Sequence, residues 1–151
     1  IFRLIDGIRY DLADGAGGVR NIISDNFEKY CLDFLSVTFP EFVCFRERKY
    51  GTRQQPKCTV DISLREGRAV KYLVECKATT LTHAEKFNQF EADDVPTKIG
   101  QLTKAFLQIW RNVRDARAEL IADYKVSESA IGIVLTLDDW IQFDEADTDF
   151  F

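Results

Sequence analysis

The chain has 151 residues, of which 46% are hydrophobic and 30% charged, and its formal net charge at pH 7 is −5. This length and balance fit one soluble domain with a real core, and no apolar run approaches the roughly 18 residues that a membrane span needs. The net negative charge argues mildly against a partner rich in phosphate, although the distribution of charge matters more than its sum.

The first predicted element is a helix over residues 19–35, where apolar residues recur at helical spacing, and Pro40 ends any continuation. Residues 42–49 read as a strand, because aromatic and β-branched residues precede a basic end. The segment "YGTRQQP", residues 50–56, is predicted as a loop. In residues 58–65 apolar and polar side chains alternate, which indicates a strand with one buried face.

"REGR", residues 65–68, supplies the next turn. Residues 70–78 form a further strand, more apolar on both faces and therefore more central. A long polar segment over residues 79–96 leads to a predicted amphipathic helix over 97–124. The apolar stripe of that helix consists of Ile99, Leu102, Phe106, Ile109, Val113 and Leu120. Residues 130–137, "AIGIVLTL", have the continuous apolar character of a buried parallel strand.

The predicted order is α-β-β-β-α-β, which indicates an α/β fold with a central mixed sheet flanked by helices. The three middle strands form a meander, and the long helix is the crossover that returns the last strand parallel. We expect one domain over residues 1–151, with its core at about residues 19–137.

The ends and the cysteines of the chain indicate whether it is part of a larger protein and in which compartment it is found. Methionine is absent, even at position 1, so we expect a piece of a larger protein. The start, "IFRLIDGIRY", lacks the charged segment and apolar core of a signal peptide. The four cysteines form no CxxC pair, which favours buried free thiols in the reducing cytoplasm.

Charged residues interrupt the two strands in "VDISLREGRAVKYLVECKATT". Glu75 and Lys77 are two apart on one strand and share a face. Whether Asp61 on the neighbouring strand shares that face depends on the turn. A regular two-residue turn at Glu66 and Gly67 puts Glu75 on the opposite face. A three-residue loop, or a β-bulge, puts Asp61 and Glu75 on the same face.

Two carboxylates on adjacent strands repel each other unless a cation lies between them, and Mg²⁺ (or Mn²⁺) prefers such oxygen ligands. A lysine beside them can stabilise the charge that develops on phosphorus, so Asp61, Glu75 and Lys77 suit metal-assisted phosphodiester hydrolysis. The alternative is a pair of surface ion pairs, Glu75–Lys77 and Asp61–Arg65, on a solvated face. The apolar character of "YLVECKATT" disfavours a solvated position.

"VDI…ECK", with thirteen residues between Asp61 and Glu75, resembles the PD-(D/E)xK signature of the restriction-endonuclease-like nuclease superfamily, and the predicted element order is similar to its core. The resemblance implies that Asp61 and Glu75 bind the metal, that the carbonyl of Cys76 is a backbone ligand and that Lys77 assists the attacking water. An acid on the first helix often supports such a site, and Glu28 is the best match.

The sequence departs from the family pattern at two places. Val60 stands where the motif has proline, and Ala105 stands four residues after Gln101, where some branches have tyrosine. His83 lacks partners that would indicate metal or nucleophilic chemistry, and we interpret it as a loop residue.

Basic and amide side chains provide a candidate nucleic-acid surface. The candidate residues are Arg46, Arg48, Lys49, Arg53 and Lys57 before the Asp61 strand, and Gln101 and Lys104 on the long helix. The pattern of the helix residues fits the solvent-exposed side of an ordinary amphipathic helix somewhat better.

The expected function is a Mg²⁺-dependent endonuclease, acting on DNA rather than RNA, within a restriction, repair or phage-defence protein. The alternative is a nuclease-like fold with little or no catalysis that binds nucleic acid or assembles with other proteins; exposed Trp110 and Trp140 would suit it. Expected protein partners are other domains of a larger chain, a separate protein or a second copy, with no membrane involved.

Overall fold

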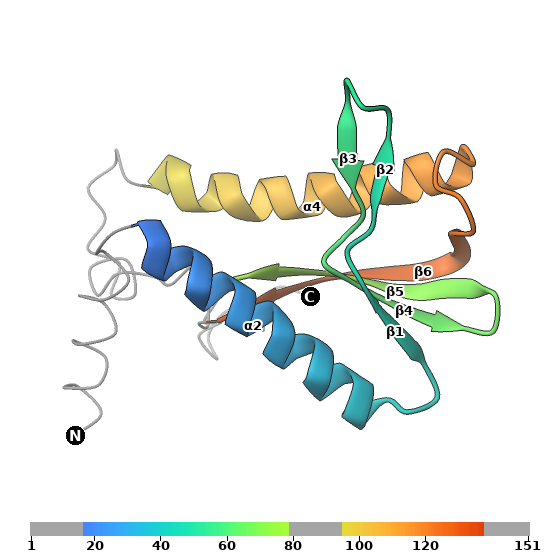
Figure 1. Ribbon diagram of the computed structural model, residues 1–151, viewed down its shortest axis with the longest axis horizontal. Helices are drawn as coiled ribbons and strands as arrows, with labels where there is room; N and C mark the ends of the chain where they lie inside the picture. Colours follow the sequence, from blue (N-terminus) through green and yellow to red (C-terminus); the bar gives the residue numbers. More distant parts are fainter. Residues whose placement is uncertain (1–16, 79–94, 138–151) are drawn as a thin grey trace, which may run out of the picture.

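The computed structural model describes residues 17–78 and 95–137, in which a four-stranded sheet lies between two long helices (Figure 1). The elements in chain order are α2 (Gly17–Thr38), β1 (Val43–Arg46), β2 (Lys49–Gly51), β3 (Pro56–Cys58), β4 (Ile62–Glu66), β5 (Ala69–Lys77), α4 (Val95–Arg117) and β6 (Lys125–Thr136). Neither helix carries an apolar stretch long enough to cross a lipid bilayer.

The sheet has the strand order β1-β4-β5-β6. β1, β4 and β5 are successive antiparallel neighbours, and β6 pairs parallel to β5 after the α4 crossover. The predicted α/β class, meander, crossover and mixed sheet flanked by helices are therefore confirmed. β5 is a central strand, as its apolar character on both faces indicates.

Each face of the sheet has its own apolar cluster, because side chains alternate along the strands. The α4 face buries Val60, Val70, Leu73, Ile109, Ala116, Ile121 and Tyr124. The α2 face buries Cys31, Leu35, Ile62, Leu64, Val74 and Cys76. All four cysteines are free thiols, and Cys31 and Cys76 are fully buried, as expected, whereas the other two are half-buried.

The segment between β1 and β4 differs from the prediction. It forms a second, two-stranded sheet, the β2–β3 hairpin, where a loop and the start of a longer strand were expected. The predicted strand over 58–65 is interrupted because Thr59 forms hydrogen bonds with Arg48. The Thr59 amide donates to the Arg48 carbonyl at 2.9 Å, and the Arg48 amide donates to Thr59 Oγ1 at 2.8 Å.

Helix α4 ends at Arg117, seven residues before the predicted end at Tyr124. Glu119 adopts a left-handed conformation, with φ of 57°. The Leu120 amide donates to the Asp115 carbonyl at 2.9 Å, and the Glu119 amide donates to the Ala116 carbonyl at 3.0 Å. This is a Schellman cap without its usual glycine, so the sequence contained no stop signal.

Two residues of the predicted α4 stripe are wrong. Phe106 is 60% exposed and Leu120 is 57% exposed. Ile109 is buried and Val113 packs against the core, as predicted, and the buried face also includes Ala105, Asn112 and Asp115. The periodicity of apolar residues therefore identified the centre of the contact face but not the two polar residues on it.

Strand β6 begins at Lys125, five residues earlier than predicted, and lies at the edge of the four-stranded sheet. It is parallel, as expected, but it is only partly buried, and Ile131 is exposed. Predictions for His83 and Trp140 concern positions outside the described residues.

Candidate active site

The register of β4 against β5 determines whether the predicted site can exist. Ile62 lies opposite Val74, so continuing this register one step places Asp61 opposite Glu75. Directly opposed residues on neighbouring strands share a face of the sheet. The structure therefore brings together, directly opposite each other, the two carboxylates that the sequence predicts as metal ligands.

A β-bulge produces this register. The turn itself has two residues, Gly67 and Arg68, and sets Glu66 opposite Ala69. An unbroken ladder from that pair would have placed Asp61 opposite Val74, with Glu75 on the other face. The ladder instead shifts by one residue between Leu64 and Arg65, which leaves Lys71 as an extra residue in β5. Of the arrangements that the prediction allowed, the bulge is the one found.

Asp61 is held by the backbone of β5. The Cys76 amide donates to Asp61 Oδ2 at 2.7 Å. Burial raises the pKa of Asp61, and this effect outweighs the opposing influence of the Cys76 amide and the Lys77 charge. The carboxylate is thus fixed in position but only partly compensated.

Glu75 is the most unusual residue of the sheet, because its carboxylate is 1% exposed in the middle of a strand. Glu75 Oε1 accepts a hydrogen bond from Lys77 Nζ at 2.7 Å, whereas Oε2 is buried with no hydrogen-bond partner among the described residues. Burial, and then the charge of Asp61, raise the pKa of Glu75 to about 7 despite the neighbouring Lys77 and a hydrogen bond from the Asp61 backbone. A buried carboxylate oxygen without a partner is costly unless something cationic or a donor meets it.

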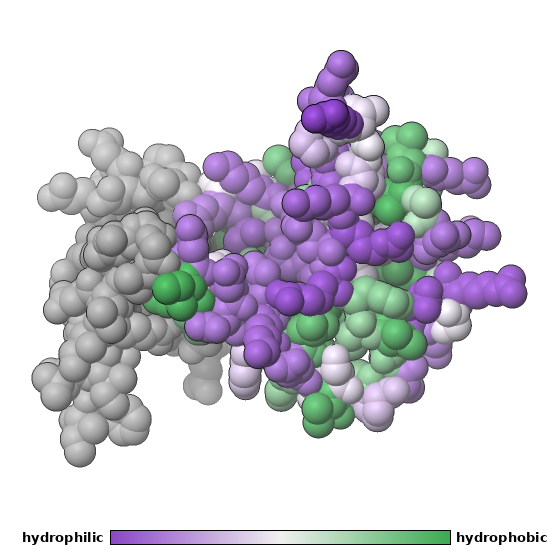
Figure 2. Space-filling model, viewed as in Figure 1, coloured by the Kyte–Doolittle hydropathy of each residue, from purple (hydrophilic) through white to green (hydrophobic). Residues whose placement is uncertain are grey.

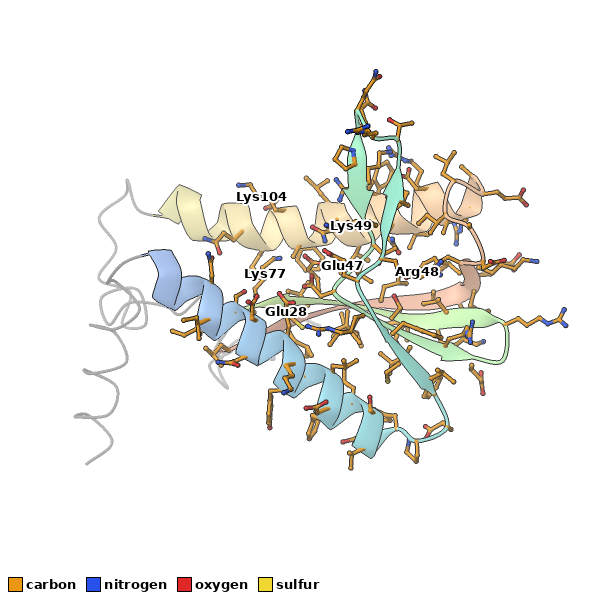
Figure 3. The ribbon with its side chains drawn as sticks, viewed as in Figure 1. Glu28, Glu47, Arg48, Lys49, Lys77 and Lys104 are labelled. Atoms are coloured by element: carbon orange, nitrogen blue, oxygen red, sulfur yellow. The ribbon has the colours of Figure 1, made fainter. Side chains whose placement is uncertain are left out.

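Glu28 reaches the same site from α2. Burial raises the pKa of half-buried Glu28, and the charges of Asp61, Asp25 and Glu47 raise it further. Figure 3 shows Glu28 on α2 and Lys77 in the space between α2 and α4. The structure therefore places the predicted helix acid near Asp61.

Glu47 is an acid that sequence reasoning missed. Arg46 lies opposite Ile62, so continuing the β1–β4 register places Glu47 on the other side of Asp61 from Glu75. The charge of Glu47 accordingly raises the pKa of Asp61. Only the strand register reveals this neighbour, since Glu47 stands in a basic stretch without a motif (Figure 3).

The backbone and the side chain of Cys76 have different surroundings. Its amide faces Asp61, whereas its thiol is buried in the cluster on the α2 face. Burial raises the thiol pKa, with a further contribution from Cys31. The thiol is thus part of the core, and only the backbone of Cys76 is available to the site.

The acids fit a hard cation that needs few protein ligands. Within residues 17–78 and 95–137, no group of three or more His, Cys, Asp or Glu side chains has the arrangement of a metal site. Asp61 and Glu75 supply two carboxylates, and Mg²⁺ is commonly bound through one or two carboxylates with water completing its shell. The unpartnered Glu75 Oε2 is the atom that such a cation would satisfy.

The predicted nucleic-acid residues differ in exposure. Arg46, Arg48, Lys49, Arg53 and Lys104 are exposed, and Gln101 is half-buried. Figure 2 shows the projecting hairpin and the surface below it as predominantly hydrophilic. Lys57 differs from the prediction, because its Nζ lies 2.9 Å from Asp115 Oδ2 in an ion pair and its charge is already compensated.

Asp115, on α4, is a buried acid that the sequence did not single out. It accepts hydrogen bonds from Tyr50 Oη and Lys57 Nζ, both at 2.9 Å, and from the Arg114 guanidinium at 2.7 and 2.9 Å. Burial alone would raise the pKa of Asp115, but these hydrogen bonds outweigh it and lower the pKa to about 2. Asp115 is therefore an ionised anchor that ties the β2–β3 hairpin to α4.

No protein-family model, curated protein or solved structure shows a significant match to the chain.

Proposed function

We propose that this protein is a Mg²⁺-dependent nuclease domain of the PD-(D/E)xK type that hydrolyses phosphodiester bonds in DNA. One observation carries the proposal: the buried Glu75 carboxylate has one oxygen without a partner among the described residues, opposite Asp61 and beside Lys77. A purely structural ion pair would need only one acid for one lysine. Two opposed acids and one ammonium leave an excess negative charge that a divalent cation would neutralise.

Asp61 and Glu75 would hold the cation, with the Cys76 carbonyl as a backbone ligand. When bound, the cation would neutralise negative charge on the scissile phosphate. Lys77 lies within hydrogen-bonding distance of Glu75 and projects between the helices, where its ammonium can stabilise the charge developing on the phosphate oxygens (Figure 3). Glu28, near Asp61, supports the ligand acid from the side of α2.

The resemblance to the PD-(D/E)xK family implies that water attacks phosphorus and that the bond to the 3′ oxygen breaks. The attacking water loses a proton and the departing 3′ oxygen gains one, so the products would carry a 5′-phosphate and a 3′-hydroxyl. The exposed basic residues Lys49, at the base of the hairpin, and Lys104, on α4 near Lys77, are in positions suited to phosphate contacts (Figure 3).

Lys77→Ala tests the proposal directly. We expect cleavage to fall by about 100-fold or more, because an electrostatic contact to the transition state is lost. Plasmid, linear duplex, single-stranded DNA and RNA are each incubated with Mg²⁺ or Mn²⁺, and products are resolved on gels. Lys71→Ala is the matched control, since this half-buried lysine lies on the same strand and only pairs with Glu66 at 3.9 Å.

Circular dichroism and the thermal midpoint verify that both variants are folded. A folded Lys77→Ala protein that cuts at the wild-type rate would exclude the assigned mechanism. Equal loss in Lys71→Ala would show that any change in β5 lowers activity and would remove the case for Lys77.

The second candidate is a nuclease-like fold that binds nucleic acid or assembles with a partner protein without catalysis. The exposed apolar surface of α4 favours it, since Trp110 is 62% exposed beside Phe106 and Leu107. Under this function the wild-type protein cuts none of the four substrates with either metal ion.

A further inference from the structure

The β2–β3 hairpin projects from the sheet past α4 (Figure 1). We propose that this hairpin enters the major groove of a duplex DNA substrate and contacts base edges through Arg53, Gln54 and Gln55 at its tip. The choice of DNA as partner rests on the proposed function. The placement in the major groove rests on the shape, the chemistry and the anchoring of the hairpin.

The dimensions of the hairpin fit the groove. From Arg48, which pairs with Thr59, to Gly51 the paired chain advances by roughly 10 Å before the turn begins, whereas the major groove of B-DNA is about 8.5 Å deep. That groove is about 12 Å wide and admits a two-stranded β-ribbon. The tip can therefore reach the floor of the groove while the base of the hairpin stays in contact with the sheet.

The tip presents side chains that suit base recognition. The Gln55 amide donates to the Thr52 carbonyl at 3.1 Å, which closes a turn with Arg53 and Gln54 at its two central positions. All residues from Gly51 to Pro56 are exposed. Arginine can donate two hydrogen bonds to guanine, and glutamine can bond adenine in the same bidentate way.

Gly51 allows the sharp turn that directs the tip outward. Its φ is +87°, and a Cβ added there would lie 2.6 Å from the Gln55 carbonyl oxygen. Any other residue at this position would distort the turn. The presentation of Arg53 and Gln54 thus depends on a backbone geometry that only glycine accommodates.

The base of the hairpin is rigidly held, as a reading element requires. Buried Asp115 on α4 accepts hydrogen bonds from Tyr50 in β2 and Lys57 in β3. The Arg48 guanidinium donates to the Ala122 carbonyl at 3.2 Å, and Gln108 Nε2 donates to the Thr59 carbonyl at 3.4 Å. Ties from both strands to the body of the protein limit the entropy lost when the hairpin binds.

The charge of the hairpin is complementary to DNA. The charged residues in the stretch 48–58 are all basic, in a chain whose net charge is −5. Lys57 is paired with Asp115, so Arg48, Lys49 and Arg53 are the residues whose charge is left for DNA. The strand β3 leads through Thr59 and Val60 directly to Asp61. A duplex held by the hairpin is therefore held beside the candidate metal ligands.

The test compares the wild-type protein with Arg53→Ala/Gln54→Ala/Gln55→Ala, both in EDTA so that no cleavage occurs. The probes are a labelled 30-base-pair DNA duplex pool of random internal sequence, one of its single strands and an RNA duplex of equal length. We expect the triple variant to lose about tenfold or more in affinity for the DNA duplex, with less than a twofold change for the single strand. Arg68→Ala, at the exposed tip of the β4–β5 turn, is the matched control and keeps wild-type affinity.

Dimethyl sulfate footprinting then locates the contact. Guanine N7 lies in the major groove, so the wild-type protein should protect it and the triple variant should not. The thermal midpoint of the triple variant should equal that of the wild type, since the replaced side chains are exposed. The inference is overturned if the triple variant binds the DNA duplex as tightly as the wild type. It is also overturned if protection falls on minor-groove adenine N3, or if the RNA duplex is preferred, because its major groove is too narrow for a hairpin.

The two proposals fail separately. Tip-dependent protection of guanine N7 without cleavage in Mg²⁺ or Mn²⁺ supports the hairpin inference and rejects the nuclease. Metal-dependent cleavage that the triple variant retains in full, with unchanged duplex affinity, supports the nuclease and rejects the hairpin inference.

Discussion

Glu75 shows most clearly how burying a single charged residue can cost a protein folding stability. Its pKa of about 7, against an ordinary value of 4.5, arises from burial and from the charge of Asp61, with Lys77 compensating only in part. A residue placed so unfavourably in the middle of a strand is typical of a functional site rather than of a core.

The pH dependence of stability tests this placement. Because the pKa of Glu75 is higher in the folded protein, the folded state binds more protons than the unfolded state between pH 4.5 and about 7. In EDTA, the free energy of unfolding of the wild type should therefore fall by about 3 kcal/mol relative to Glu75→Gln as the pH rises through this window. Urea denaturation of both proteins at several pH values measures the difference.

Added Mg²⁺ provides the complementary measurement at a pH of about 8, above the raised pKa of Glu75. It should raise the thermal midpoint of the wild type and leave that of Glu75→Gln nearly unchanged, because a bound ion stabilises the folded state. Parallel stability curves for the two proteins, together with no response to Mg²⁺, would contradict both the pKa shift and the metal site.

Some residues of the candidate site and its surroundings could be identified from the sequence, and others could not. Asp61, Glu75 and Lys77 stood out because charge interrupts an apolar pattern, and the structure brings the three together. Glu47 and Asp115 did not stand out. Each is an acid among basic neighbours in the sequence, and its importance depends on the element that packs opposite it.

Among the secondary-structure elements, two irregularities define the site and its surroundings. The bulge at Lys71 sets the register of β4 against β5, and the tie at Thr59 turns an expected strand into the β2–β3 hairpin. Both are local departures from regular pairing. The main elements α2, β5 and α4 were predictable because long periodic segments carry a strong signal.

The predicted helix was longer than α4, and the reason can be tested at a residue just after the end of α4. Glu119 is sterically strained in its left-handed conformation, where glycine would not be. Glu119→Gly should raise the free energy of unfolding by about 0.5 kcal/mol, after the greater flexibility of glycine in the unfolded chain is subtracted. Chemical denaturation measures the change.

Glu119→Ala is the control for that measurement, since it removes the same side chain but keeps the Cβ. It should give no gain in stability. A gain equal to that of Glu119→Gly would mean that the glutamate side chain, and not the backbone conformation, is the unfavourable feature.

Across the whole molecule, charge is segregated rather than balanced. The chain has a net charge of −5, yet exposed basic residues gather on the hairpin and at Lys104 near the paired acids. Under the proposed function, the acidic total would repel DNA at long range, whereas these residues would attract it locally. Binding should therefore depend strongly on salt.

The salt dependence of duplex binding makes this quantitative. If Arg48, Lys49 and Lys104 each contact a phosphate, log K should fall against log salt with a slope of about −3. Lys104→Ala should reduce the magnitude of the slope by about 1, whereas Arg68→Ala should leave it unchanged. Fluorescence anisotropy in EDTA, at salt concentrations from about 50 mM to about 300 mM, measures the slope. An unaltered slope in Lys104→Ala would remove this residue from the interface.

The amino-acid sequence alone was enough to predict the α/β fold class, the main helices, the central strand and the two opposed acids and the lysine of the candidate site. These follow from periodicity and from charge placed in apolar strands, both of which are local properties of the chain. The meeting of the two acids, the presence of Glu47 beside them and the role of Asp115 in securing a projecting hairpin emerged only from the packed, three-dimensional arrangement. Strand register, a bulge of one residue and a helix cap without glycine depend on contacts between distant segments, and such contacts leave little trace in any one stretch of sequence.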